Sequence, residues 1–260
     1  MQRIDTKNGV RKISIIEKIT QEISKELKRT APELSSDQID WRNKILNSNN
    51  PNFFGYGHKV SDIERIIKEI HMKYQCSFED ALNVSQNLMS SNIQEEKFAG
   101  FLFLNRFKKH FNHTTIELLE RLLSENCDTW AFCDSICIRL IGPFLGKKKN
   151  EQLAIQTINN WSKSENLWVR RGSMVILLKT IMMKKEFNKD YVFKFVEKML
   201  ESSEDYIHKG IGWLLKTCSK YDPDAIFKYL MTNKERFPRL VLRYASEKLP
   251  KEKRALILKK

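Results

Sequence analysis

The sequence predicts an all-α protein. Its 260 residues contain only 9 Gly and 6 Pro, about half of the usual share of roughly 12%, which leaves too few turn residues for a sandwich or barrel of many short strands. Apolar residues recur instead three and four positions apart, as at Ile63, Ile66, Ile67 and Ile70, and this is the spacing of one buried helix face. Alternation with a period of two residues is hard to find. With 41% hydrophobic residues, the chain has ample material for a core.

Turn and cap residues divide the chain into successive helices. Residues 1–50 are the least regular, and we expect them to form a helical extension or cap before a repeat domain over residues 51–260. Cap residues or proline predict helix starts at Thr115, within Ser164-Glu165-Asn166, and at Asp222-Pro223. The breaks stand at Asn49-Asn50-Pro51-Asn52, Ser90-Ser91-Asn92, His113-Thr114-Thr115, Gly146, Ser162-Lys163-Ser164, Asn188, Glu201-Ser202-Ser203, Tyr221-Asp222-Pro223 and Phe237-Pro238.

The spacing of these helices indicates a repeat. From about residue 92 onward, paired antiparallel helices recur with a period of about 40 residues, which is the mark of HEAT-like repeats. Trp130, Trp168 and Trp213 fall in successive units, 38 and 45 residues apart. We therefore predict a HEAT-like α-α solenoid. Such a solenoid needs no partner chain to close its core, so we expect a monomer.

The positive charge is confined to one half of the chain. The 46 Lys and Arg outnumber the 32 Asp and Glu by 14, and residues 1–138 carry no net charge, so the whole excess lies in residues 139–260. A merely solvated surface predicts scattered charge. The concentration instead indicates a polyanionic partner, with nucleic acid as the first choice and an anionic membrane surface as the second.

Several other classes of site have no support in the sequence. No run approaches the ~18 apolar residues of a membrane span, and the first twelve residues lack an apolar signal core, so we expect an intracellular, cytoplasmic protein. The five cysteines include no CxxC pair. Cys127, Cys133 and Cys137 lie in one segment, but no nearby histidine completes a zinc set, so we expect buried thiols and no metal. Nucleotide-binding fingerprints are absent, and we expect no cofactor.

Trp130 and Asp134 are the first candidates for a functional site. They are four residues apart, so on a helix they project from the same face. In a structural interpretation, Trp130 belongs to the core and Asp134 caps a helix or pairs with a lysine. In a functional one, an indole and a carboxylate line a site suited to a flat cationic group and to positive charge that develops in a transition state. Both interpretations stay open on these residues alone.

Two further segments carry unusual residue combinations. Adjacent Arg170 and Arg171 cannot share a helix face, so one can point to the interior or a concave surface while the other meets solvent. Arginine is also suited to bidentate contacts with phosphate. Gly210 and Gly212 leave room for close approach, either by another helix or by the backbone of a ligand.

Four motifs in order give a specific resemblance. They are Asp128-x-Trp130-x-x-x-Asp134-Ser135, Trp161-Ser-x-Ser-x-Asn-x-Trp168-x-Arg170-Arg171, His208-Lys-Gly-Ile-Gly-Trp213-x-Leu215 and Leu242-Arg-Tyr-Ala-x-Glu-Lys248. With them, roughly residues 52–250 resemble the AlkD-type DNA alkylation repair family, whose members are DNA glycosylases built from HEAT-like repeats. The resemblance implies a concave basic groove that grips duplex DNA. It also implies hydrolysis of the N-glycosidic bond of N3- and N7-alkylated purines, without metal or cofactor.

The resemblance also implies roles for individual residues. Alkylated purines are already cationic leaving groups, so the catalyst has to stabilise an oxocarbenium-like sugar and position a water. The matching family aspartate is Asp134, and the matching tryptophans, Trp130 and Trp213, would hold the deoxyribose of the damaged nucleotide. The family arginine, a phosphate contact, matches Arg171. Other basic residues assigned to the DNA surface, for which helix packing or an internal ion pair fits equally well, are Arg170, Lys209 and Arg243.

Three functions stay under consideration. The first is a monofunctional alkylpurine DNA glycosylase acting on double-stranded DNA. The second is a non-catalytic HEAT-like protein that binds branched or damaged DNA, and the third is a protein–protein adaptor, which the charge excess disfavours. In a DNA-binding protein we expect Lys147, Lys148 and Lys149 to contact phosphates, although such a run alone is typical of a basic surface loop.

Overall fold

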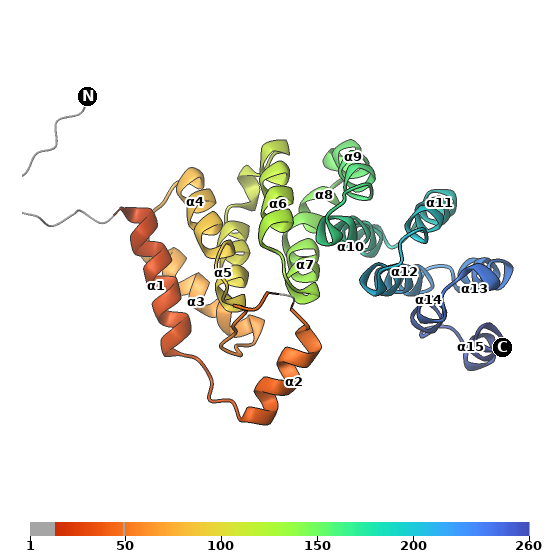
Figure 1. Ribbon diagram of the computed structural model, residues 1–260. Helices are drawn as coiled ribbons and strands as arrows, with labels where there is room; N and C mark the ends of the chain where they lie inside the picture. Colours follow the sequence, from red (N-terminus) through yellow and green to blue (C-terminus); the bar gives the residue numbers. More distant parts are fainter. Residues whose placement is uncertain (1–13, 49, 260) are drawn as a thin grey trace, which may run out of the picture. The chain divides into compact units, whose positions relative to one another are not determined.

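The computed structural model describes residues 14–48 and 50–259, so the first part of the predicted N-terminal extension lies outside the described residues. Within this part of the chain the elements are helices, and the one β-type pairing is a bridge between Phe54 and Ile93. The predicted all-α class is confirmed. The described chain divides into two compact units (Figure 1), one made of residues 14–34 and Asn52–Phe107, the other of the remaining described residues. None of the described helices is long and apolar enough to cross a membrane.

The first unit is a cluster of four helices. It contains α1 (Ile15–Arg29), α3 (Val60–Lys73), α4 (Phe78–Met89) and α5 (Gln94–Asn105), which pack around a common core. Ile19, Ile23 and Leu27 of α1 are fully buried, so α1 contributes one face of that core. Its start is set by a capping box in which the Ser14 hydroxyl accepts from the Glu17 backbone and the Glu17 carboxylate accepts from the Ser14 backbone. The domain boundary expected at residue 50 stays a prediction.

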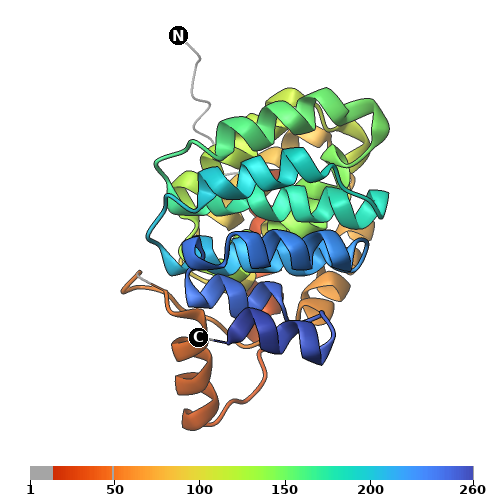
Figure 2. The ribbon, with the colours of Figure 1, turned by 90° about the vertical axis from the view of Figure 1, so that its right-hand side faces the viewer.

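The second unit consists of helices in two layers. The inner helices α7 (Trp130–Ile136), α10 (Leu167–Lys184), α12 (Asp205–Cys218) and α14 (Arg239–Ala245) lie side by side in that order. Figure 2 shows the stacked helices of this unit. The helices that pack behind them are α6 (His113–Asn126), α9 (Glu151–Trp161), α11 (Lys189–Met199), α13 (Pro223–Thr232) and α15 (Lys251–Leu258). The remaining elements are α2 (Ser36–Leu46), α8 (Gly142–Leu145) and the short η1 (Lys108–His110), η2 (Cys137–Ile141), η3 (Lys148–Asn150) and η4 (Lys234–Arg236). The predicted helical-repeat fold is confirmed.

The helix caps agree with the sequence in two of three predicted places. Asp222 accepts from the Ala225 backbone N–H, with Pro223 as the first residue of α13. Asn166, in the predicted segment, caps α10. The cap expected at Thr115 is wrong: Asn112 is the N-cap of α6, and Thr115 is the third helical residue of the same capping box. A threonine can serve either as the N-cap or as the third helical residue of a capping box. Here Asn112, three residues before Thr115, takes the N-cap position.

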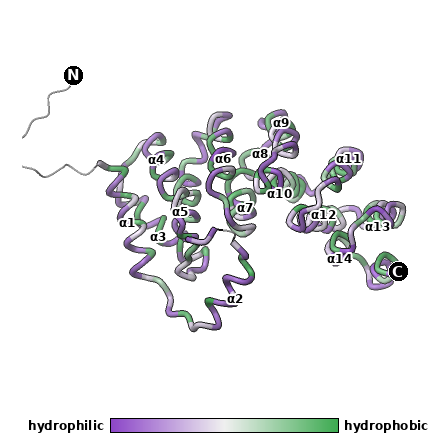
Figure 3. The backbone as a smooth tube through the Cα atoms, in the orientation of Figure 1, coloured by the Kyte–Doolittle hydropathy of each residue, from purple (hydrophilic) through white to green (hydrophobic). Residues whose placement is uncertain are grey.

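Helix amphipathicity explains the layering. Figure 3 shows hydrophobic and hydrophilic positions mixed along the helices of the second unit, as expected where one face of a helix packs against a neighbour. The middle of α10 is an exception because it contacts helices on several sides: Met174, Val175, Ile176 and Leu178 are all buried. A helix that is apolar all round belongs inside a fold, and α10 is the centre of the second unit.

The two glycines of α12 serve helix packing. A Cβ at Gly210 would lie 2.6 Å from the end of the Met174 side chain on α10, and one at Gly212 would overlap the Cβ of Tyr244 on α14. Of the two alternatives, another helix or the backbone of a ligand, the structure therefore shows the first: α10 and α14 approach α12 closely at these glycines. This packing brings α10, α12 and α14 together at the cavity described below.

We expect Gly212→Ala to destabilise the protein by about 1–3 kcal/mol relative to Gly210→Ala, because overpacking against a fixed Cβ costs that much. Both substitutions gain the same helix propensity, and the Gly210 methyl meets only the flexible end of Met174. The measurement is the free energy of unfolding in urea for both variants. Equal stabilities would contradict the tight contact between α12 and α14.

A π-helix interrupts the repeat pattern. The chain passes from α7 through η2, a π-helix, into α8 without a break. Gly142 follows, and its N–H bonds the carbonyl of Cys137, five residues earlier. The next residue, Pro143, has no N–H to bond the carbonyl of Arg139, so the wider turn lies where the α-helical bonding is interrupted. Such segments are frequent at functional sites. Here the α-helical turns before it carry Trp130 and Asp134.

Candidate functional site

One cavity in the second unit collects the main candidate residues. It has a volume of about 540 Å³ and is bordered by the end of α2 and by α7, α10, α12 and α14. Five residues predicted from the sequence line it: Trp130, Asp134, Arg171, Lys209 and Trp213. Its other lining residues are Lys44, Ile45, Asn47, Tyr206, Lys216 and Tyr244. Aromatic and cationic side chains therefore surround a single carboxylate.

Asp134 and Arg171 form a bidentate ion pair in this cavity. The Arg171 Nε donates to Asp134 Oδ1 at 2.8 Å and Nη2 donates to Oδ2 at 2.7 Å. Arg171 Nη1 also donates to the backbone carbonyl of Tyr206. The two residues are 9% and 5% exposed. Arg171 thus fixes the carboxylate and joins three inner helices, α7, α10 and α12.

Burial and the ion pair act against each other on the carboxyl group. Burial raises the pKa of Asp134, Arg171 lowers it, and burial prevails, which places the pKa at about 6. For Arg171, burial lowers the pKa, but Asp134 outweighs it and raises the pKa above its ordinary value. Both groups are therefore charged at neutral pH. A buried carboxylate with one cationic partner is the strongest negative charge in the cavity.

The two candidate tryptophans lie on different helices. Trp130 begins α7 and Trp213 lies in the middle of α12, and both are half-buried. The Trp130 indole N–H donates to the carbonyl of Ile45 at 2.9 Å, which fixes this ring at the end of α2. Lys209 places its ammonium 5.3 Å from the centre of the Tyr206 ring, a cation–π contact.

The contribution of α2 is not indicated by the sequence. Lys44, Ile45 and Asn47 lie at the end of this helix and line the cavity. Asn47 adopts a left-handed conformation with φ of 46°, and its amide lies 3.4 Å from the Tyr206 hydroxyl. A capping box of Ser35 and Gln38 predicts the helix itself. No signal in the sequence near α2 predicts that its end contacts Trp130 and Tyr206, which lie 85 and 159 positions away from their partners Ile45 and Asn47.

Other predicted DNA-contact residues lie outside the cavity. Arg170 forms an ion pair with Glu204, at 2.7 and 2.8 Å, and donates to the carbonyls of Ser164 and Glu165. Arg243 is exposed on α14. Lys147, Lys148 and Lys149 are exposed at η3, and the Lys147 ammonium lies 5.9 Å from the Phe144 ring centre.

The cysteine segment contains free thiols. Cys133 and Cys137 are buried, and Cys133 Sγ donates to the Trp168 carbonyl at 3.3 Å. Burial raises the pKa of Cys127 and Cys137. In the residues that the structure describes, no group of three or more His, Cys, Asp or Glu is placed to hold a metal ion.

The fold and this cavity define a class of protein: a helical-repeat protein with an aromatic, cationic site around one carboxylate. The sequence profile of the family described as DNA alkylation repair enzyme matches residues 15–249, and the chain belongs to that family. A solved structure of a predicted DNA alkylation repair enzyme from Enterococcus faecalis shares the fold, with a TM-score of 0.70 and 16% sequence identity over 85% of this chain and 100% of that one. No curated protein matches the sequence.

Proposed function

We propose that this protein is a DNA glycosylase that hydrolyses the N-glycosidic bond of N3- and N7-alkylated purines in double-stranded DNA. Its membership of a DNA alkylation repair family supports a DNA substrate. The observation that carries the proposal is the buried Asp134 carboxylate in one cavity with Trp130 and Trp213. A protein with this function acts inside the cell, where its DNA substrate is.

The geometry fits the electronic demand of this reaction. A cationic purine leaves without prior protonation, so the charge to be stabilised develops on the sugar. Asp134, ionised at neutral pH, would stabilise that charge and orient a water toward the anomeric carbon. Each carboxylate oxygen accepts one bond from Arg171 and keeps a further acceptor position for the water. The water oxygen bonds to the anomeric carbon as the carbon–nitrogen bond breaks. The cationic purine takes the bonding pair and leaves as a neutral base, and the proton that the water loses passes through Asp134 to the solvent.

The remaining lining residues would bind the nucleotide. Trp130 and Trp213 offer aromatic surface to the deoxyribose, while Lys44 and Lys209 offer ammonium groups to the flanking phosphates. Lys216 also lines the cavity, but its ammonium forms an ion pair with Glu247 at 2.7 Å. Arg171 has two N–H groups beyond its three bonded ones, so it can contact a phosphate while it holds Asp134. The direct test is release of 7-methylguanine and 3-methyladenine from methylated duplex DNA by the full chain. Absence of release would refute the proposal.

Base release should depend on pH through Asp134. Because the reaction needs the carboxylate and its pKa is about 6, we expect the single-turnover rate to be constant from pH 7 to 8 and to fall about tenfold for each pH unit well below 6. The rate is measured after subtraction of spontaneous depurination without protein. A rate that rises toward acid would indicate a protonated group in place of this carboxylate.

Charge at η3 should affect all duplexes alike. We expect Lys147→Gln, Lys148→Gln and Lys149→Gln together to weaken binding of methylated and unmethylated DNA equally and to lower the salt slope by roughly 1 per lost phosphate contact. The measurement is affinity against salt concentration. Lys228→Gln, at an exposed position of α13, is the control and should leave the slope unchanged. An unchanged slope in the triple variant would remove these lysines from the interface.

One observation favours a second candidate, a non-catalytic protein that binds branched or damaged DNA. Both oxygens of Asp134 are bonded to Arg171, which is how a purely structural carboxylate is held. This candidate predicts salt-sensitive DNA affinity without base release, and a cavity in which Trp130 and Trp213 only pack or stack.

A further inference from the structure

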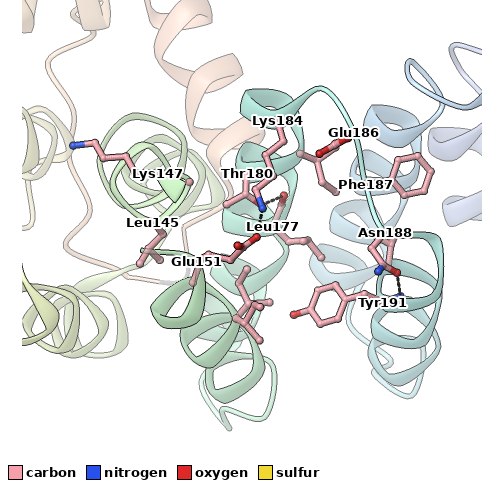
Figure 4. Close-up of a pocket in the computed structure, with 16 residues that line it drawn as sticks. Leu145, Lys147, Glu151, Leu177, Thr180, Lys184, Glu186, Phe187, Asn188 and Tyr191 are labelled. Atoms are coloured by element: carbon pink, nitrogen blue, oxygen red, sulfur yellow. Dashed lines mark hydrogen bonds and ion pairs between the residues drawn. The ribbon is translucent and has the colours of Figure 1, made fainter. Parts of the chain in front are cut away.

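Two cavities adjoin in the outer layer of the second unit, where α9 and α11 face each other. One has a volume of about 280 Å³ and lies beside the first half of α9 (Figure 4). The other has a volume of about 300 Å³ and lies beside the second half. Tyr191 of α11 lines both, so we call the pair the α9–α11 furrow. It shares no lining residue with the Asp134 cavity.

The first cavity is the apolar end of the furrow. Ile155 and Ile158 of α9, Leu177 and Ile181 of α10, and Val192 of α11 line it. Figure 4 shows the Leu177 and Tyr191 side chains directed toward the space beside α9. Ile155 is 47% exposed there, although an isoleucine is usually buried. Lys184 and Glu151 form an ion pair at its rim, and Lys147 and Glu186 also line this cavity.

The second cavity is the cationic end. Lys163, Lys194 and Lys198 line it, and its lining contains no acidic residue. Lys198 bonds the Ser162 hydroxyl at 3.2 Å. Among the described residues, none of the three lysines forms an ion pair. Tyr191 and Phe195 stack here with ring centres 6.4 Å apart, which keeps an aromatic wall next to the ammonium groups.

We propose that the α9–α11 furrow docks a short segment of a protein partner that carries a large apolar side chain next to two or more carboxylates. The apolar end has the volume for one or two such side chains, as in interface pockets filled by an anchor residue. The lysines complement the carboxylates. DNA could bind only at the cationic end, because its backbone has no apolar group that would pack against Ile155 and Ile158 at the other end. A partner docked here leaves the Asp134 cavity open on the inner helices.

The test selects 12-residue peptides from a random displayed library against the full chain. The expected peptides pair Leu, Ile, Phe or Trp with neighbouring Asp or Glu. A synthetic peptide of that consensus should bind the Ile155→Glu variant, and separately the Lys194→Glu, Lys198→Glu double variant, at least tenfold more weakly than the wild type. All three positions are exposed, so folding should persist, and circular dichroism checks it. Lys228→Glu is the matched control and should change affinity less than twofold.

Competition separates this partner from other occupants. Unmodified duplex DNA should compete only weakly, because Lys147 is the one residue lining the furrow that is also a predicted DNA contact. Dodecyl phosphate should also compete only weakly. Selection of no peptides, or of peptides without this pattern, would overturn the proposal. Displacement by DNA would reassign the lysines to the DNA surface, and strong competition by dodecyl phosphate would reassign the furrow to an amphiphile. Base release stays a separate readout, because the furrow variants leave the Asp134 cavity intact.

Discussion

Asp134→Asn is expected to reduce base release by about 10²–10³-fold or more while duplex DNA still binds. The substitution keeps the shape of the side chain but removes the charge that faces the developing oxocarbenium ion, and loss of one such electrostatic contact costs this much in catalysis. The amide oxygen that replaces the carboxylate can still accept from one nitrogen of Arg171. The arginine therefore keeps part of its anchoring, together with its bond to the Tyr206 carbonyl.

The measurement is single-turnover release of methylpurines from methylated duplex DNA, with affinity for the same duplex measured in parallel. Glu204→Gln is the matched control, because it removes the carboxylate that pairs with the adjacent Arg170 outside the cavity. We expect the control to release bases at the wild-type rate. If Asp134→Asn lost affinity and activity in the same proportion, the carboxylate would be structural, and the non-catalytic DNA-binding candidate would replace the glycosylase.

The second large effect concerns stability. Arg171→Met should lower the free energy of unfolding by about 3–5 kcal/mol at pH 7.5, because it leaves Asp134 buried without its cationic partner. Arg170→Met should cost about 1 kcal/mol or less, since its ion pair with Glu204 is partly exposed. Urea unfolding at constant temperature measures both. Similar losses for the two variants would contradict a special role for the Asp134–Arg171 pair.

The pH dependence of this loss distinguishes a buried charge from simple loss of packing. Without Arg171, the pKa of Asp134 in the folded protein should rise further above its value in the unfolded chain. A carboxyl group whose folded pKa is raised favours the folded state at acid pH, where it is protonated, and this contribution is lost as the pH rises through the folded pKa. The deficit of Arg171→Met relative to the wild type should therefore be smaller at pH 5 than at pH 7.5. An equal deficit at both values would attribute the loss to packing alone.

The helical organisation follows largely from local sequence. Cap residues and apolar spacing predict most helix starts, because a helix is set by neighbours three and four positions apart. The capping box of Ser14 and Glu17 is a signal of the same kind. It predicts α1 as a regular helix within residues 1–50, which otherwise show the least regular pattern of the chain. The π-helix before Pro143 could not be predicted, because the wider turn is one of several ways to accommodate a proline.

The sequence identified five of the eleven residues that line the candidate cavity, but not the contacts between them. The motifs identified Trp130, Asp134, Arg171, Lys209 and Trp213, and the structure brings these five into one cavity. The motifs did not predict that Arg171 pairs with Asp134. Arg170 and Arg171 are neighbouring residues of the same type, so the sequence does not show which of them meets the carboxylate. The roughly 100° turn between successive helical residues directs one guanidinium to Glu204 and the other to Asp134.

The sequence by itself determined the helices, the repeat, the location of the charge excess and the family, because periodicity, caps and motif order are properties of short segments. Only the tertiary structure decided which residues meet. The end of α2 joins the cavity, Gly210 and Gly212 admit neighbouring helices, and Arg171 reaches Asp134 across 37 positions. These contacts depend on packing between helices distant in the chain, where burial and side-chain volume, rather than local spacing, select the partner.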